Sequence, residues 1–360
     1  MSQPKRVLVV GAGVIGLSCA HAIVSAPDIS PSVQLTVLAS SLDESSTTSF
    51  GSAGLWKPNL IENTAQDKVF EWGRKTFEYL LYLYYSDCAA EAGISLQQAY
   101  HIFETVQDTA DPFWKDVVLD FKRLSKEHLR KLQLPDMYVD GYSYTTLTVQ
   151  QSIYLPFLMK TLRAHNVTFI EKKINSLEEF LQSYTSSSSS SSTTRSSAYD
   201  VVINCTGLGA YSMVNDTTMF PIRGVVVRLK APHIKSIWFF GDSYIIPNCT
   251  NVVVGGSADR GVWDLTVTSQ EQEMIVDKAS ALFPSLRSAE VEGVWCGLRP
   301  GRNEVRLEME RMMDGSGTGM LVVHCYGHGG CGVTLSWGCA LEVLNTHIRP
   351  LLVMRPDMHE

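Results

Sequence analysis

The first forty residues show a hydrophobic pattern that predicts one β–α–β unit. Arg6–Val10 is a short run rich in β-branched residues, which is typical of a fully buried parallel strand. A glycine-rich turn, Gly11–Gly16, follows directly, and Leu17–Val24 then has the composition of a helix. Gln34–Leu38 has the pattern of a second buried strand. Strand, turn, helix and strand in this order form a βαβ unit.

Further segments predict more helices and strands of this kind. The expected helices are Phe70–Tyr85, Ile153–His165 and Val333–Ile348. The expected strands are Val167–Glu171, Tyr199–Asn204 and a run that begins at Met320.

The middle of the chain has a different pattern. Val225–Leu229, Tyr244–Pro247 and Asn251–Val254 are β-branched runs with turn residues between them, which favours an antiparallel sheet. Ser186–Ser192 consists only of serine and cannot bury apolar surface, so we expect a flexible loop there. Because the two patterns alternate along the chain, we predict an α/β fold in which a discontinuous domain with the βαβ unit is interleaved with a mainly antiparallel one.

Composition and charge exclude several classes of protein. The chain has 360 residues, which suggests two domains at about 150 residues each. The net charge of −7 argues against nucleic-acid binding, because phosphate contacts need a basic surface. No apolar run approaches the roughly 20 residues of a membrane-spanning helix, so we expect no membrane association. The apolar run at Val7–Ala12 is interrupted by glycine, and we expect no secretory signal peptide.

The spacing of cysteines and histidines does not indicate a metal site. The eight cysteines are scattered singly, without a CxxC pair, and fit a reducing compartment. His324 and His328 lie close in sequence, but a metal needs more ligands than this neighbourhood offers. We therefore expect no metal, and a structural or cofactor-adjacent role for these histidines.

Gly11, Gly13 and Gly16 form the fingerprint of a dinucleotide site. The first glycine allows a tight turn, the second lets the backbone approach a pyrophosphate, and the third lets the helix pack on the strand. The helix N-terminus adds positive potential. Ser40 stands where the second strand is expected to end in an acidic residue for the ribose hydroxyls. The fingerprint alone does not distinguish NAD from FAD.

Three other segments carry candidate chemistry, each with a plainer alternative. Thr47–Pro58 is rich in hydroxyls and small residues, and is either a second contact for a dinucleotide or a polar loop. Tyr326–Gly332 precedes a helix whose N-terminus could stabilise negative charge on a reduced flavin, or is only a helix-entry loop. Arg299, followed by Pro300, suits bidentate binding of a carboxylate or forms a surface ion pair.

Taken together, these motifs resemble the D-amino-acid oxidase and D-aspartate oxidase family. The matching segments are Gly11–Ser18, Ala53–Pro58, Val202–Gly207, Tyr244–Pro247, Gly297–Pro300, Val305–Glu308 and Tyr326–Gly330. The resemblance implies a Rossmann-like FAD-binding domain interleaved with a substrate domain built on a twisted, mainly antiparallel sheet. The expected ranges are 1–60, 150–215 and 290–360 for the FAD-binding domain, and 61–149 and 216–289 for the substrate domain.

The resemblance also implies roles for individual residues. Arg299 and Tyr244 would bind the substrate α-carboxylate, and the Gly330 carbonyl would accept from the substrate amine. Phe240, at the position of a lid tyrosine, and Trp56 would border the substrate. The residues expected to contact FAD are Gly11, Ala12, Gly13, Val14, Ile15, Gly16, Ser40, Thr48, Ser49, Gly54, Leu55, Ile174, Thr206, Gly207, Gly329, Gly330, Gly332 and Thr334.

The implied reaction is oxidative deamination of a D-amino acid to a 2-oxo acid, ammonia and hydrogen peroxide, by hydride transfer from Cα to FAD. Ile237 and Ala258 occupy positions where D-aspartate oxidases carry arginine, so we expect neutral substrates. A D-aspartate oxidase is the alternative, with Arg260 or Arg223 as the second carboxylate ligand, and a nucleotide-binding protein without oxidase activity is a third hypothesis.

The expected partners are the D-amino acid and molecular oxygen, and the sequence leaves open whether the chain forms a homodimer. The final residues, Met358–Glu360, do not match a peroxisomal SKL-type signal. We therefore expect a cytoplasmic location, with the peroxisome as the alternative that the family suggests.

Overall fold

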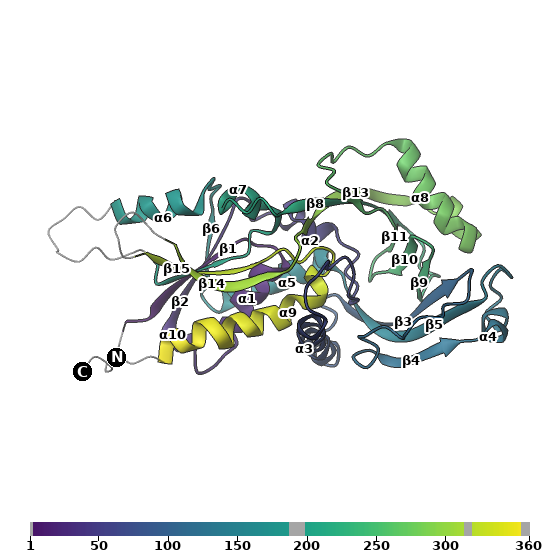
Figure 1. The fold of residues 1–360 in the computed structure, drawn as a ribbon, viewed down its shortest axis with the longest axis horizontal. Helices are drawn as coiled ribbons and strands as arrows, with labels where there is room; N and C mark the ends of the chain where they lie inside the picture. Colours follow the sequence, from purple (N-terminus) through teal and green to yellow (C-terminus); the bar gives the residue numbers. More distant parts are fainter. Residues whose placement is uncertain (1–2, 187–198, 313–318, 354–360) are drawn as a thin grey trace.

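The computed structural model describes residues 3–186, 199–312 and 319–353, which form two β-sheets joined side by side (Figure 1). Most of the serine run and the C-terminal residues Met358–Glu360 lie outside the described residues, so the expectations placed on them stay predictions. None of the described helices combines the length and apolarity needed to cross a bilayer.

The first sheet contains the predicted βαβ unit. Its strand order is β14-β15-β7-β1-β2-β6, and only the pair β14–β15 is antiparallel. The strands are β1 (Lys5–Val10), β2 (Val33–Ala39), β6 (Thr168–Glu171), β7 (Val201–Asn204), β14 (Arg306–Met312) and β15 (Met320–Tyr326). The strands predicted near residues 6, 34, 167, 199 and 320 are thereby confirmed to within two residues.

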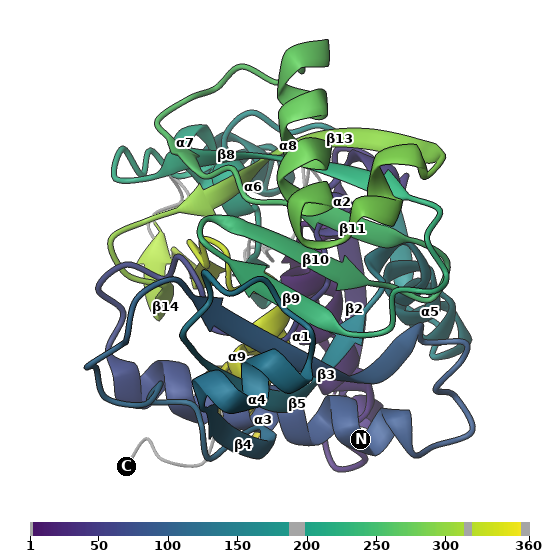
Figure 2. The ribbon, with the colours of Figure 1, turned by 90° about the vertical axis from the view of Figure 1, so that its right-hand side faces the viewer.

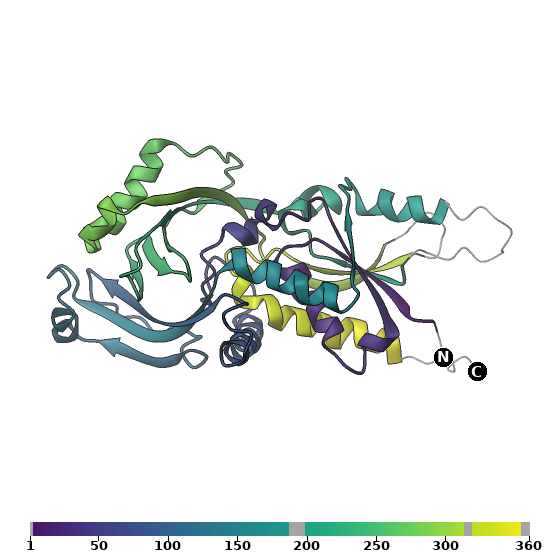
Figure 3. The same cartoon turned by 180° about the vertical axis from the view of Figure 1, so that it is seen from behind.

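Helices cover both faces of this sheet because its strands are apolar on both sides. Val7 and Val9 of β1 belong to the core formed with α1 (Val14–Val24), α5 (Gln151–Ala164) and α9 (Gly332–Glu342). Leu8 and Val10 point to the opposite face, where α6 (Leu177–Ser186) packs. A π-helical segment, Val343–Ile348, and α10 (Arg349–Val353) continue α9 along the sheet (Figure 3).

The second sheet is the expected antiparallel one, with the order β12-β8-β11-β10-β9-β3-β5-β4 and β13 paired to β8. Only β3 and β9 are parallel among its pairs. The strands are β3 (Ile94–Phe103), β4 (Leu119–Leu124), β5 (Asp140–Val149), β8 (Phe220–Leu229), β9 (Ile237–Phe240), β10 (Ser243–Pro247), β11 (Val252–Gly255), β12 (Asp259–Arg260) and β13 (Val291–Gly301). The sequence pattern did not predict β3, β4 and β5.

The two faces of this sheet have different surroundings. Helix α8 (Ser269–Leu282) lies against β8, β10 and β11 and covers what we call the outer face (Figure 2). The inner face carries Tyr244 and Phe239 and joins the main core, which includes α3 (Gln66–Tyr84). Strand β13 pairs with β8 over most of its length and so belongs to this sheet, although it lies in the range 290–360 expected for the FAD-binding domain. The remaining division into domains stays a prediction.

Candidate active site

A cavity of about 520 Å³ opens where the parallel strands of the first sheet end. Val10 of β1, Ala39 of β2 and Tyr326 of β15 line it, together with Cys205 directly after β7. The carboxyl ends of parallel strands are the usual ligand site of an open α/β sheet. The cavity is therefore the place to look for a dinucleotide.

The glycine turn at the base of this cavity has the geometry that a pyrophosphate requires. Gly11 has φ +115°, and a Cβ there would lie 2.4 Å from the Cys205 carbonyl oxygen. A Cβ on Gly16 would lie 2.0 Å from the Gly11 carbonyl oxygen, whereas one on Gly13 would meet only the Ser49 hydroxyl at 3.3 Å. The Val14 N–H donates to that hydroxyl at 3.0 Å. The cradle is open to a phosphate at the N-terminus of α1.

Most of the residues expected to contact FAD line this cavity. They are Gly11, Ala12, Gly13, Val14, Ile15, Ser40, Thr48, Ser49, Ile174, Thr206, Gly207, Gly329, Gly330 and Gly332. Gly16 does not, because it lies at the contact between helix and strand.

Gly54, Leu55 and Thr334 are also held away from the cavity lining. The Gly54 carbonyl accepts from the Val149 N–H at 2.7 Å, and Leu55 forms a β-bridge with Thr148. The Thr334 hydroxyl accepts from the Lys57 N–H at 3.1 Å and donates to the Lys57 carbonyl at 3.0 Å. The hydroxyl of Thr334 therefore fixes the backbone of Lys57.

Two lysines that the sequence reasoning missed line the cavity beside Ser40. Lys172 and Lys173 follow β6 directly, and the Lys172 N–H donates to the Ala39 carbonyl at 2.8 Å. Their place after a strand parallel to β2 was the signal that could have identified them. They provide positive charge at the end of β2, where the usual acidic residue is absent.

His328 offers a further feature that a cofactor would satisfy. It is buried, it lines the cavity, and its Nε2 has no hydrogen-bond partner among the described residues. A buried polar atom without a partner is rare in a folded protein. The open glycine cradle and this nitrogen both fit a bound dinucleotide with polar edges.

Arg299 connects the cavity to the inner face of the second sheet. It lies in β13 and lines the cavity, and its guanidinium lies over Gly224, where a Cβ would approach Nη1 to 2.3 Å. Its Nη1 donates to the Ser257 carbonyl at 3.2 Å. No carboxylate from the described residues forms an ion pair with it. A partly buried guanidinium without a counter-ion is suited to bind an anion.

Tyr244 lies on the same face, outside the cavity lining. A Cβ on Gly255, its partner in β11, would lie 2.5 Å from the Tyr244 hydroxyl, so the glycine leaves room for the ring. Burial raises the pKa of Tyr244, and the Arg299 guanidinium opposes that shift. The phenol is therefore protonated at neutral pH and is able to donate to a carboxylate.

Phe240 and Trp56 do not border this face. Tyr244 is paired in register with Phe239, whose ring centroid lies 6.2 Å away, and alternation along β9 turns Phe240 into the core under α8. Trp56 is fully buried, and its indole N–H donates to the Gly73 carbonyl at 3.0 Å. The short hairpin between β9 and β10 was the signal that could have placed Phe239 opposite Tyr244.

Neither arginine considered for a second carboxylate is free to bind one. Arg223 is buried on the outer face and pairs with Glu271 at 2.8 Å and Asp259 at 3.4 Å. Arg260 pairs with Glu62 at 2.9 Å and lies over the ring of Phe220. Both side chains already have acidic partners within the chain.

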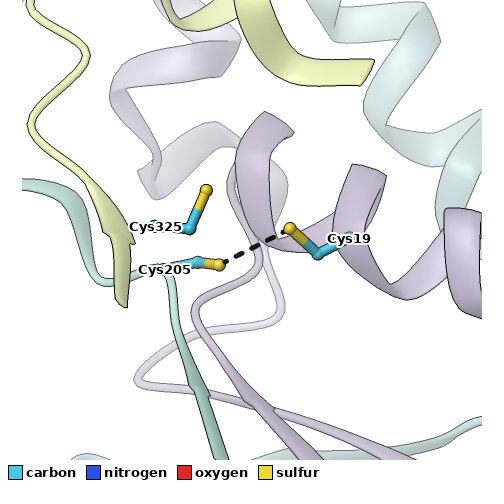
Figure 4. A group of neighbouring side chains, drawn as sticks. All are labelled: Cys19, Cys205 and Cys325. Carbon is cyan, nitrogen blue, oxygen red and sulfur yellow. Dashed lines mark hydrogen bonds between the residues drawn. The ribbon is translucent and has the colours of Figure 1, made fainter. Parts of the chain in front are cut away.

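Three cysteines far apart in the sequence meet in the core (Figure 4), and two of them, Cys205 and Cys325, also line the cavity. Cys19 of α1, Cys205 and Cys325 of β15 are buried, and their sulfur atoms all lie within 4.8 Å of one another. The Cys205 thiol donates to the Cys19 sulfur at 4.0 Å. The cluster packs inside the main core, where thiols behave as small apolar groups. Spacing along the sequence gave no sign of it, and the expected absence of a metal stays a prediction.

Comparison with known proteins agrees with this geometry. The family model described as FAD dependent oxidoreductase matches residues 6–345. Human D-aspartate oxidase is 33% identical over 339 residues, which cover 94% of this chain and 93% of that protein. A D-amino-acid oxidase from Rubrobacter xylanophilus is also 33% identical, covering 94% of each chain.

The fold is also similar to that of solved structures. A glycine oxidase from Geobacillus kaustophilus superimposes with a TM-score of 0.74 at 18% identity, over 96% of this chain and 95% of that one. The chain thus belongs to the D-amino-acid oxidase family of FAD-dependent oxidoreductases.

Proposed function

We propose that this protein catalyses oxidative deamination of D-amino acids. The observation that carries the proposal is the arrangement of Arg299 and Tyr244. A guanidinium with no acidic partner among the described residues and a protonated phenol lie on one sheet face, next to the cavity. Relatives named D-aspartate oxidase and D-amino-acid oxidase support the same reaction.

The chain's own residues would bind and orient the substrate. Arg299 forms two parallel hydrogen bonds to the α-carboxylate, and Tyr244 donates a third. The Gly330 carbonyl accepts from the amine. The Gly329 N–H donates to the Pro300 carbonyl at 2.8 Å, which ties the loop that carries Gly330 to the residue after Arg299. The spacing between the two substrate contacts is therefore fixed by the backbone.

Three fixed points distinguish the enantiomers. With carboxylate and amine held, only one enantiomer directs its Cα hydrogen toward the cavity, and no titrating base is needed at that carbon. The glycine turn Gly11–Gly16 and the loop at Gly329 would hold FAD, which would supply the two-electron redox chemistry, with molecular oxygen as the final acceptor and hydrogen peroxide as its product. The imino acid product hydrolyses in water to a 2-oxo acid and ammonia.

The first test is the visible spectrum of the FAD-loaded protein in the absence of oxygen. D-alanine, D-aspartate and their L-enantiomers are added in turn. We expect at least one D-amino acid to bleach the flavin bands and the L-forms to leave them unchanged. Unchanged flavin bands with a full panel of D-amino acids would contradict the proposal.

The second question is whether the side chain of the substrate is neutral or acidic. Neutral side chains were expected because Ile237 and Ala258 replace arginines, and the rings of Phe239 and His101 on the inner face also favour an apolar group. Lys57 lies on the same face and brings a positive charge to it.

A further inference from the structure

Lys57 brings a positive charge to the inner face of the second sheet. Its ammonium lies 4.2 Å from the centroid of the Phe239 ring, which is the cross-strand neighbour of Tyr244. Within residues 3–186, 199–312 and 319–353, no carboxylate forms an ion pair or hydrogen bond with it. The Thr334 hydroxyl forms hydrogen bonds with both the N–H and the carbonyl of Lys57, which fixes the backbone that carries the side chain.

The groups around Lys57 are neutral or positively charged at neutral pH. Burial lowers the pKa of His101 well below its usual value and raises the pKa of the Cys331 thiol to about 12. Burial also raises the pKa of Tyr142 and Tyr244, so both phenols keep their protons.

The remaining charges on this face are arginines. Arg228 lies on the same face of β8 as Gly224, and its guanidinium donates to the Gly51 carbonyl at 3.0 Å. It has no ion pair within the described part of the chain, and neither has Arg299. A partly buried face that carries several cations, with no anion in the part of the chain that the structure describes, is stabilised when a ligand supplies negative charge.

The positions of these cations along the sheet suit a ligand with two carboxylates. Strands follow in the order β13-β8-β11-β10-β9, so Tyr244 lies between Arg299 and the Lys57–Phe239 pair. A substrate whose α-carboxylate is bound by Arg299 and Tyr244 then has Lys57 on the far side of the phenol. A second carboxylate on a short side chain would face the ammonium.

We propose that Lys57 determines specificity by binding the side-chain carboxylate of an acidic D-amino acid. The inference rests on the proposed function and gives its substrate class. Lys57 would then be the second carboxylate ligand. Arg223 and Arg260 are unsuited to that role because each already forms an ion pair with a glutamate.

The test compares D-aspartate with D-asparagine, which has nearly the same shape without the charge. Wild-type kcat/KM is expected to favour D-aspartate. In Lys57→Met, kcat/KM for D-aspartate should fall about 10- to 100-fold, as expected for loss of a charged hydrogen bond, while D-asparagine and D-alanine change less than about threefold. Lys57→Arg should restore part of the preference. Lys68→Met is the matched control, because that lysine lies near the Trp72 ring on α3, away from this face.

A binding measurement that needs no turnover accompanies the kinetics. Succinate and butyrate have the same chain length and differ by one carboxylate, and their binding to the FAD-loaded protein is followed by perturbation of the flavin spectrum. Wild type should bind succinate more tightly than butyrate, and Lys57→Met should remove the difference.

The outcomes separate the two proposals. An unchanged preference for D-aspartate over D-asparagine in Lys57→Met would overturn the role of Lys57, as would a wild type that oxidises D-alanine but not D-aspartate. The latter result leaves oxidative deamination intact. Failure to oxidise any D-amino acid would instead overturn the proposed function. Flavin content and melting temperature, compared with those of Lys57→Arg, show whether Lys57→Met is folded.

Discussion

The outer and inner faces of the second sheet differ in whether their cations form ion pairs. Strand β8 directs Arg223 outward, where Glu271 and Asp259 neutralise it, and directs Arg228 inward, where it has no ion pair among the described residues. Arg299 and Lys57 share that inner face, and within residues 3–186, 199–312 and 319–353 they also lack acidic partners. The difference shows that an arginine with a carboxylate partner within the chain has a structural role, whereas an arginine without one can bind a substrate.

The largest effect is expected for Arg299→Met. Loss of the guanidinium would leave a substrate carboxylate unpaired in a partly buried site, so kcat/KM for every D-amino acid should fall by about two to three orders of magnitude. FAD should remain bound, because most of the cavity lining is unchanged. Steady-state kinetics and flavin absorbance test both statements, and near-native kcat/KM would show that Arg299 does not bind the carboxylate.

A large effect of a different kind is expected for Phe240→Ala. This ring is buried under α8, so the substitution should lower the free energy of unfolding by about 3 kcal/mol through lost packing. Phe239→Ala, on the inner face, should instead alter KM. Chemical denaturation measures the free energy of unfolding of both variants, and steady-state kinetics measures their KM. If Phe240→Ala changed KM and Phe239→Ala did not, the assignment of the two faces would be reversed.

Arg223→Met should also affect stability and leave activity intact. The arginine makes charged hydrogen bonds to Glu271, whose carboxylate is partly exposed, so we expect a loss of about 2 kcal/mol in the free energy of unfolding. Urea titration measures the loss. A selective drop in kcat/KM for D-aspartate would point back to Arg223 as a substrate ligand.

The smallest effect is a dependence on pH. Burial lowers the pKa of Lys57 to about 8, so its positive charge is present below that pH and is lost as pH rises through it. Around it His101 is already neutral, Cys331, Tyr142 and Tyr244 stay protonated, and the other groups on this face are the guanidiniums of Arg228 and Arg299. KM for D-aspartate should therefore rise a few-fold relative to KM for D-alanine between about pH 7 and 9. Parallel profiles for the two substrates would contradict this.

The sequence was a good guide where structure is local. The first βαβ unit was predictable because a buried strand, a glycine turn and a helix leave their pattern in adjacent residues. Gly11, Gly13 and Gly16 alone carry the signal of a dinucleotide site in this unit.

Contacts between distant residues were not predictable in the same way. The position of Lys57 depends on Thr334, and the neutralisation of Arg223 depends on Glu271, both far away in the sequence. The choice between Phe239 and Phe240 depends on hairpin register, in which one residue reverses the face. The meeting of Cys19, Cys205 and Cys325 follows from the packing of three separate elements.

The most direct test compares anaerobic flavin reduction in wild type, Arg299→Met and Arg223→Met, each loaded with FAD and mixed with increasing amounts of a D-amino acid that reduces the wild type. The account predicts that Arg223→Met retains the saturable, rapid reduction of the wild type, whereas Arg299→Met needs far more substrate and reacts slowly. Equal rates and affinities in the two variants would contradict the claim that the unpaired cations of the inner face bind the substrate.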